Sequence, residues 1–116
     1  MNNHKEQLFD LINELVLIKN KKIHIYGAST KLNTILNFCN IGPELIPFAA
    51  ERSPEKYGAT TISGIKIISE EESKNMNPDY YLVGPYHFKD EILLREKKLI
   101  QKGTKFIFPL PEITVI

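Results

Sequence analysis

The segment IHIYGASTKLNTIL (residues 23–36) contains the pattern that decides the fold. A short, mainly apolar run ends at Gly27, small residues follow, and apolar positions then return with helical spacing. This succession predicts a strand over residues 21–26, a tight turn, and a helix that ends near Gly42. The apolar face of this helix, which we assign to the core, contains Leu32, Ile35, Leu36 and Cys39.

Strands and helices alternate along the rest of the chain. Ser69 followed by Glu72 matches a capping box at the start of a short helix. Acidic residues early, basic residues late and Gly103 at the end predict a longer helix over residues 88–103. Short apolar runs predict strands over residues 44–51, 65–68, 79–84 and 105–108. A leading helix over residues 4–19 is predicted to bury Leu8, Leu11, Ile12, Leu15 and Ile18.

Alternation of this kind favours a parallel sheet, because parallel neighbours need a crossover connection that a helix supplies. We therefore expect an α/β fold, a Rossmann-like three-layer sandwich with a mainly parallel sheet of about five strands and helices on both faces. A chain of 116 residues buries one core of modest size. The expected organisation is a single domain over residues 1–116, in which a leading helix over 1–20 precedes a Rossmann-like unit over 22–116.

The composition argues against several classes of partner and site. Lysine and arginine number 15 against 14 acidic residues, so the net charge of +1 gives no reason to expect binding to nucleic acid or to an anionic membrane. The single cysteine cannot form an internal disulfide or a thiolate zinc cluster. Since the sequence shows neither a signal peptide nor a long apolar span, we expect a cytoplasmic protein whose partners are small molecules or proteins.

In Rossmann-like folds, ligands bind beyond the carboxyl ends of the strands, where the first strand-to-helix turn offers free backbone N–H groups. One glycine in this turn is not a dinucleotide fingerprint, which argues against NAD as the ligand. Hydroxyl groups after the glycine can cap the helix, donate to a phosphate or sugar oxygen, or do both. The candidate binding residues of the turn are Gly27, Ala28, Ser29, Thr30 and Lys31.

Polar residues near this turn extend the candidate site. Lys31 and Asn33 lie off the apolar face of the predicted helix, where they face either solvent or a ligand, and asparagine inside a helix needs a local reason. At the end of the next predicted strand, Glu51 stands about where related folds place an acid on ribose hydroxyls, and Arg52 beside it is a candidate phosphate partner. An exposed ion pair accounts for Glu51 and Arg52 equally well.

The loop after the strand predicted at residues 79–84 should reach the same edge. Tyr86 and His87 are candidates for stacking on a base or a sugar, whereas Phe88 is assigned to the core. Because no serine, cysteine or carboxylate partner can be assigned to His87, we expect no catalytic residue in this chain. His4 and His24 lack the spacing of metal ligands, so no metal site is expected.

Four ordered blocks of the sequence resemble one family: residues 25–58, 64–69, 77–92 and 103–113. They resemble the C-terminal domain of the sugar C-methyltransferases that act on nucleotide-linked deoxysugars. The resemblance extends from about Lys22 to the end of the chain. The motifs that support it are Gly27-Ala-Ser-Thr-Lys31, Asn33-Thr34, Ser53-Pro54 followed by Lys56 and Gly58, Phe88 before Asp90-Glu91, and Pro109-Leu-Pro111.

The resemblance implies a binding role without catalysis. Enzymes of this family combine a small zinc-binding region, a central domain that binds S-adenosylmethionine and contains the catalytic residues, and a Rossmann-like C-terminal module. This chain resembles the third part, so zinc and S-adenosylmethionine are expected in other domains and no cofactor is expected here. The implied role is to help bind the nucleotide-linked sugar beside a methyltransferase core domain or subunit. The residues singled out by the resemblance are Gly27, Ser29, Lys31, Asn33 and the Ser53-Pro54 turn.

The sequence departs from the family pattern at three places. Family members usually have glycine at the position of Leu32, aspartate at that of Glu51, and tryptophan-asparagine at that of Tyr86-His87. Two alternatives therefore stay open. One is a structural domain that docks on a methyltransferase core without binding a ligand. The other is the N-terminal module of a sugar acetyltransferase, against which stands the absence of a hexapeptide repeat.

Overall fold

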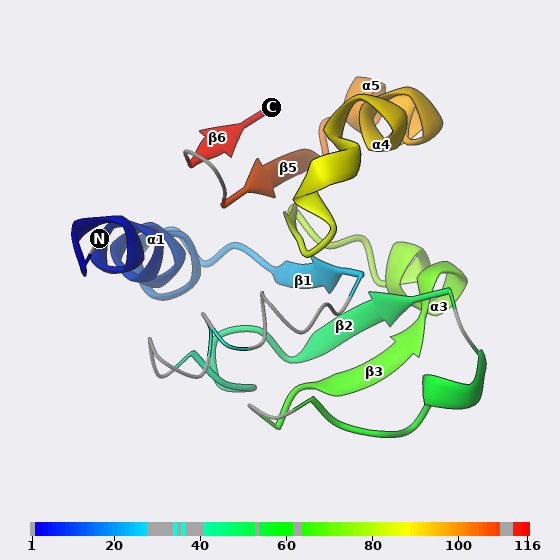
Figure 1. The fold of residues 1–116 in the computed structure, drawn as a ribbon, viewed down its shortest axis with the longest axis horizontal. Helices are drawn as coiled ribbons and strands as arrows, with labels where there is room; N and C mark the ends of the chain where they lie inside the picture. The colour runs from blue at the N-terminus through cyan, green and yellow to red at the C-terminus, as the bar shows by residue number, and fades with distance from the viewer. Residues whose placement is uncertain are drawn as a thin grey trace.

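The computed structural model describes residues 2–27, 34, 36, 41–52, 54–61, 64–109 and 113–116. Within these residues, six strands form one sheet in the order β3-β2-β1-β4-β5-β6 (Figure 1). The strands are β1 (Ile23–Tyr26), β2 (Phe48–Glu51), β3 (Lys66–Ser69), β4 (Tyr80–Val83), β5 (Lys105–Phe108) and β6 (Thr114–Val115). The helical segments are α1 (Asn2–Asn13), η1 (Glu14–Ile18), η2 (Pro54–Lys56), α3 (Glu70–Asn75), η3 (Tyr86–Phe88), α4 (Lys89–Arg95) and α5 (Lys97–Lys102).

Strands β1 to β5 run parallel to their neighbours, which confirms the expected mainly parallel sheet. β6 is antiparallel to β5, and Ile116 exchanges a pair of 2.9 Å backbone hydrogen bonds with Phe106. The sequence does not predict β6, because a two-residue strand is too short to show a period of two. β5 coincides with its predicted range, and β1, β3 and β4 lie within two residues of theirs.

The strand predicted over residues 44–51 begins later than expected. Backbone N–H groups of Leu45 and Ile46 donate to the carbonyl of Gly42, at 3.1 and 3.0 Å, and these bonds form a turn before the strand. Pro47 then follows, and it has no N–H group to donate to a neighbouring strand. β2 therefore begins only at Phe48, and the prediction for residues 44–47 is wrong.

The leading helix changes its winding near its end. α1 continues into η1, a π-helical turn in which the N–H of Lys19 donates to the carbonyl of Glu14 at 2.9 Å. The wider turn shifts the phase of the side chains that follow it. Leu8, Ile12 and Leu15 are buried as predicted, but Ile18 is 78% exposed, so its assignment to the buried face is wrong. Of the second predicted helix, Thr34 and Leu36 have helical backbone, and the other residues between 28 and 40 lie outside the described part.

The helix predicted over residues 88–103 consists of separate segments. η3 precedes α4, and Glu96 interrupts the helix between α4 and α5. Gly103 ends α5 with a φ of +113°, as its position predicted. At the start of α3, the hydroxyl of Ser69 accepts a 3.0 Å hydrogen bond from the N–H of Glu72, which confirms the predicted helix start.

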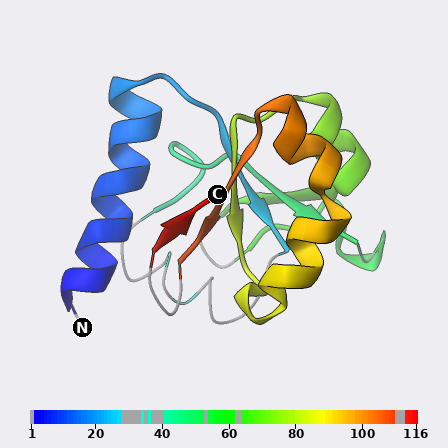
Figure 2. The same cartoon turned by 90° about the horizontal axis from the view of Figure 1, so that it is seen from above.

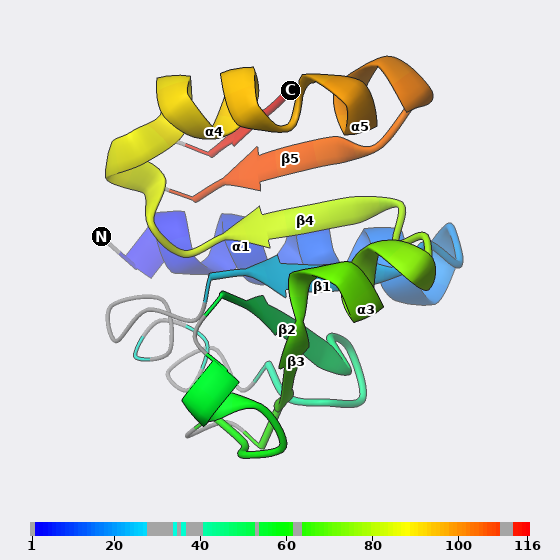
Figure 3. The ribbon, with the colours of Figure 1, turned by 90° about the vertical axis from the view of Figure 1, so that its right-hand side faces the viewer.

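Helices cover both faces of the sheet, which gives the expected three-layer arrangement (Figures 2 and 3). α1 packs on one face, where the core includes Ile25, Leu36 and Leu82. α3, α4 and α5 cover the other face, whose core has an aromatic centre. The buried members of this second core are Tyr26, Ala50, Tyr81, Val83, Ile92, Phe106 and Phe108.

Candidate functional site

The order of the strands reverses beside β1. β2 and β3 lie on one side of β1, whereas β4 and β5 lie on the other. In open parallel sheets, the crevice beyond the carboxyl ends of the strands at such a switch point is the usual ligand site. Here the N–H of Gly27 donates to Ala50 and the N–H of Gly84 donates to Tyr26, both at 2.9 Å. These bonds hold the carboxyl ends of β1, β2 and β4 together.

Gly27 is the first residue after β1 and touches the segment that follows β4. Its φ is +77°, in the left-handed region that favours glycine. A Cβ atom on Gly27 would lie 2.8 Å from Cδ of Pro85, closer than carbon atoms normally approach. The predicted turn therefore requires glycine for two reasons, backbone conformation and close packing.

Glu51 is the last residue of β2, and Arg52 follows it at the same edge. Glu51 is half-buried, and its Oε1 accepts a 2.9 Å hydrogen bond from the N–H of Arg52. The hydroxyl of Tyr57 lies 3.5 Å from the carbonyl of Arg52 and adds an exposed ring beside these two residues. Sequence reasoning missed Tyr57, because a lone aromatic residue in a polar loop shows no pattern.

Tyr86 and His87 follow β4, which lies on the other side of β1 from Glu51 and β2. Their rings stack with centroids 4.1 Å apart and an interplanar angle of 27°. Phe88 is 55% exposed, so its assignment to the core is wrong. The helical turn η3 explains the difference, because its N–H bonds from Tyr86 to Gly84 and from Phe88 to Pro85 close a tight turn that leaves Phe88 at the surface.

The parallel sheet thus brings several candidate residues to one edge. Glu51 ends β2 and Arg52 follows it, Gly27 follows β1, and the Tyr86-His87 stack follows β4. Their roles in binding stay predictions. The other candidates lie outside the described residues: Ala28, Ser29, Thr30, Lys31 and Asn33.

A buried ionic cluster supports β1 from the face covered by α3, α4 and α5. The carboxylate of Glu96, only 4% exposed, accepts the hydroxyl hydrogen of Tyr26 and lies 3.0 Å from Nζ of Lys74. Nη2 of Arg95 also donates to the Tyr26 hydroxyl, at 2.6 Å. Burial, and next the hydrogen bond to Glu96, raise the pKa of Tyr26 above its usual range. The cluster fixes Tyr26, the residue directly before Gly27.

Sequence reasoning missed this cluster. Glu96 stands in the run Arg95-Glu96-Lys97-Lys98, which has the composition of an exposed helix face. Its partner Tyr26 is 70 residues away in the chain. Short sequence patterns do not report contacts over such separations.

Among the residues described above, no group of three or more His, Cys, Asp or Glu side chains is placed to hold a metal ion. None of the described helices combines the length and the apolar character needed to cross a membrane.

Comparison with known proteins shows the family to which the chain belongs. The sequence profile of the C-methyltransferase C-terminal domain matches residues 1–111, a range that includes α1. The C-methyltransferase NovU of Streptomyces niveus is 35% identical over 102 residues, which are 87% of this chain and 24% of NovU. The chain thus spans about a quarter of the length of this relative. On these matches, the chain belongs to the family of C-methyltransferase C-terminal domains.

Proposed function

We propose that this domain helps to hold a nucleotide-linked sugar at the carboxyl edge of its sheet, for methyl transfer by machinery outside this chain. The observation that supports the proposal best is the gathering of Gly27, Glu51 and the Tyr86-His87 stack around the switch point beside β1. These few residues offer contacts for one nucleotide and its sugar. A dinucleotide is not needed to explain them.

Each candidate side chain has a chemistry suited to one part of such a ligand. The Glu51 carboxylate can accept hydrogen bonds from ribose hydroxyls, and the Arg52 guanidinium can bind phosphate oxygens with two donors. The Tyr86-His87 stack offers a flat surface for a base. Ser29 and Lys31, singled out by the family resemblance, add a hydroxyl and an ammonium group for the diphosphate.

In this proposal, the residues that transfer the methyl group lie outside this chain. We assign no catalytic role to the candidates, and the ring of His87 stacks on Tyr86. We propose that S-adenosylmethionine and zinc bind to other parts of the longer proteins of this family. The residues of this chain then position the sugar, and its role is in substrate affinity.

Calorimetric titration of the chain with a thymidine diphosphate deoxysugar tests the proposal. We expect saturable binding that is lost in the double variant Ser29→Ala with Lys31→Ala. Lys97→Ala on α5, an exposed lysine away from the carboxyl edge, is the matched control and should bind like the wild type. Absence of binding heat at millimolar ligand would contradict the proposal.

A docking domain without a ligand is the second candidate. Phe88 and Leu94 are 55% and 76% exposed near and on α4, and docking on another domain would bury them. This function predicts that the chain and a methyltransferase core associate in a pull-down, and that Leu94→Glu weakens the association. Retained association in Leu94→Glu, together with sugar binding by the isolated chain, would favour the first function.

A further inference from the structure

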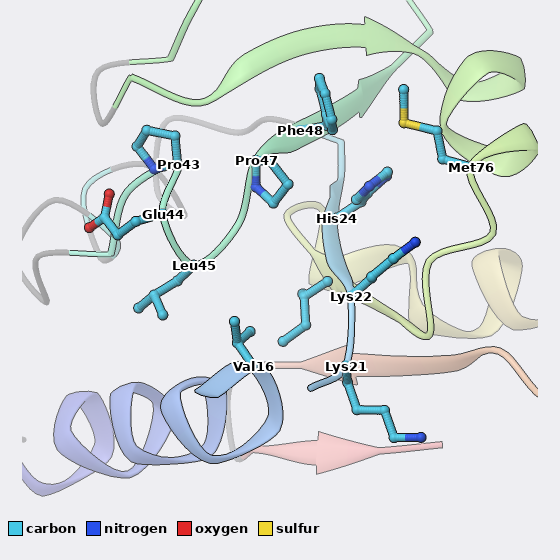
Figure 4. Close-up of a pocket in the computed structure, with 11 residues that line it drawn as sticks. Val16, Lys21, Lys22, His24, Pro43, Glu44, Leu45, Pro47, Phe48 and Met76 are labelled. Atoms are coloured by element: carbon cyan, nitrogen blue, oxygen red, sulfur yellow. The ribbon is translucent and has the colours of Figure 1, made fainter. Parts of the chain in front are cut away.

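A pocket opens at the opposite edge of the sheet from the candidate sugar site. It has a volume of about 550 Å³, within the range of small-molecule sites, and lies where β1 and β2 begin (Figure 4). Eleven residues line it, and none of them belongs to the carboxyl-edge candidates. The pocket therefore cannot be part of the site described above.

Apolar side chains form most of its walls. They come from the middle of η1, from the segment before β2, from β2 itself and from the residue after α3. The Phe48 ring lies edge-on to His24, with centroids 5.5 Å apart. This surface suits a flat apolar body. The apolar wall residues include Val16, Leu45, Pro47, Phe48 and Met76.

The innermost polar group of the pocket is His24, which is only 3% exposed. Its Nδ1 lies 2.7 Å from the Ser73 hydroxyl, which in turn lies 2.8 Å from the Tyr81 hydroxyl. If Tyr81 donates to Ser73 and Ser73 donates to His24, both hydroxyl hydrogens have acceptors. The opposite direction would leave the buried Tyr81 hydrogen without one among the described residues, so the first direction is favoured.

This proton arrangement fixes what His24 offers to the pocket. With Nδ1 as the acceptor, the neutral ring has its hydrogen on Nε2, and no described residue accepts that hydrogen. Burial, and next the charge of Lys22, lower the pKa of His24 to about 4, so the ring is neutral at pH 7. His24 thus provides a nearly buried N–H donor that an acceptor on a ligand would satisfy.

Lys22 provides the positive charge at the rim. Asp79 fixes its backbone, since the N–H of Lys22 donates to Oδ2 of Asp79 at 2.9 Å and its carbonyl accepts from the N–H of Asp79 at 2.8 Å. The side chain extends past His24 towards Met76, and the described residues provide no ion-pair partner for its ammonium group (Figure 4). A carboxylate can therefore approach Lys22 and His24 together.

Glu44 also lines the pocket, and its negative charge would oppose an anionic ligand. Its carboxylate is folded towards Gly42, where Oε2 lies 3.0 Å from the position a Cβ atom would take. Figure 4 shows both oxygens on the side away from His24. The anion site is therefore at the Lys22 end of the pocket.

We propose that this pocket binds a small aryl carboxylate, with the ring against Phe48 and the carboxylate accepting hydrogen bonds from Nε2 of His24 and Nζ of Lys22. The proposal is independent of sugar binding, because the two sites lie at opposite edges of the sheet. A ligand here would contact both β1 and β2.

Titration of the ¹⁵N-labelled chain with benzoate, followed by NMR, tests this site. We expect saturable shifts of the amides of Lys22, His24 and Phe48, and weaker binding of the uncharged analogue benzamide. Lys22→Gln should weaken benzoate binding about fivefold, the size of effect that a partly exposed ion pair has. Lys66→Gln is the matched control, since Lys66 is exposed at the start of β3 and does not line the pocket.

Two results would overturn the proposal. One is the absence of saturable shifts at these amides. The other is equal weakening by Lys22→Gln and Lys66→Gln, which would show general attraction of anions to the surface. Phe48→Ala gives a further measure, because it removes the ring contact without changing charge, and it should weaken benzoate and benzamide alike.

Discussion

At the scale of single residues, alanine would be unfavourable at Gly27 for two reasons, the backbone conformation and the lack of space for a Cβ atom. Its φ is +77°, and a Cβ atom would lie 2.8 Å from Cδ of Pro85. We expect Gly27→Ala to lower the free energy of unfolding by about 2–4 kcal/mol, from backbone strain and overpacking together. Urea denaturation measures this loss.

Gly58→Ala is the control that separates the two effects. Gly58 has a φ of +86°, but nothing lies within 4 Å of its Cβ position. Only the strain applies, so we expect a loss of about 1–2 kcal/mol. If Gly27→Ala and Gly58→Ala lower the free energy of unfolding by equal amounts, the close approach of Gly27 to Pro85 contributes nothing to the loss.

His24 makes the stability of the chain depend on pH. Its folded pKa of about 4 lies below the ordinary value of 6.5, so protons bind the unfolded chain more tightly. The contribution of neutral His24 is complete above pH 6.5 and is lost as the pH falls from 6.5 through 4. We expect a loss of about 1–3 kcal/mol over this range.

Urea denaturation of wild type and His24→Gln at several pH values checks this expectation. The stability difference between the two proteins should shrink as the pH falls, because glutamine does not take up a proton. An NMR titration of the His24 ring in the folded chain supplies the midpoint directly. A midpoint near 6.5 would contradict the assigned burial effect.

At the scale of elements, local chemistry predicted some boundaries and long-range contacts decided others. Ser69 and Gly103 mark helix ends in the sequence because a cap and a left-handed stop need only neighbouring residues. Ile18 and Phe88 were misassigned because a π-turn and a tight helical turn shift the phase that a uniform helix would keep. The break at Glu96 was not predicted, because no glycine or proline marks it, and the Glu96 side chain bonds to Tyr26 of β1, 70 residues away.

Glu96 connects three elements, and its replacement tests this connection. Glu96→Gln keeps the shape of the side chain but removes the negative charge that lies 3.0 Å from Nζ of Lys74 and 3.6 Å from Nε of Arg95. Since Lys74 is partly exposed, we expect a loss of about 1–3 kcal/mol in the free energy of unfolding. The pKa of Tyr26 should also fall towards its ordinary value, which ultraviolet titration measures.

Glu91→Gln on α4 is the matched control, because Glu91 is exposed. It should change neither the stability nor the tyrosine titration by a measurable amount. A Glu96→Gln protein as stable as Glu91→Gln would show that the buried ion pair only compensates for its own desolvation.

At the scale of the whole molecule, the alternation of strands and helices predicted both the sheet and the edge at which the candidates meet. Glu51 and His87 reach one edge because parallel strands end on the same side. The pocket at the other edge was not predictable, because it combines Val16, Lys22 and Phe48 from three separate segments. To predict such a pocket, one would need the orientation of the helix, the first residue of each strand and the path of the loop between them.

The sheet topology also predicts how stability is distributed over the molecule. β1 pairs with β2 on one side and β4 on the other, and both of its faces are covered. β6 has two residues and one described neighbour. Amides of β1 should exchange hydrogen only through global unfolding, whereas the N–H of Ile116, bonded to Phe106, should exchange about 100-fold faster through local opening.

Hydrogen exchange at low urea concentrations distinguishes these two routes. Urea should accelerate exchange in β1 in proportion to the surface exposed by global unfolding and leave the exchange of Ile116 almost unchanged. Equal urea dependence at both places would mean that β6 opens only with the whole sheet. The expected gradient has a consequence for function, since both candidate sites adjoin β1, and a ligand at either edge would then be held by the most stable strand of the sheet.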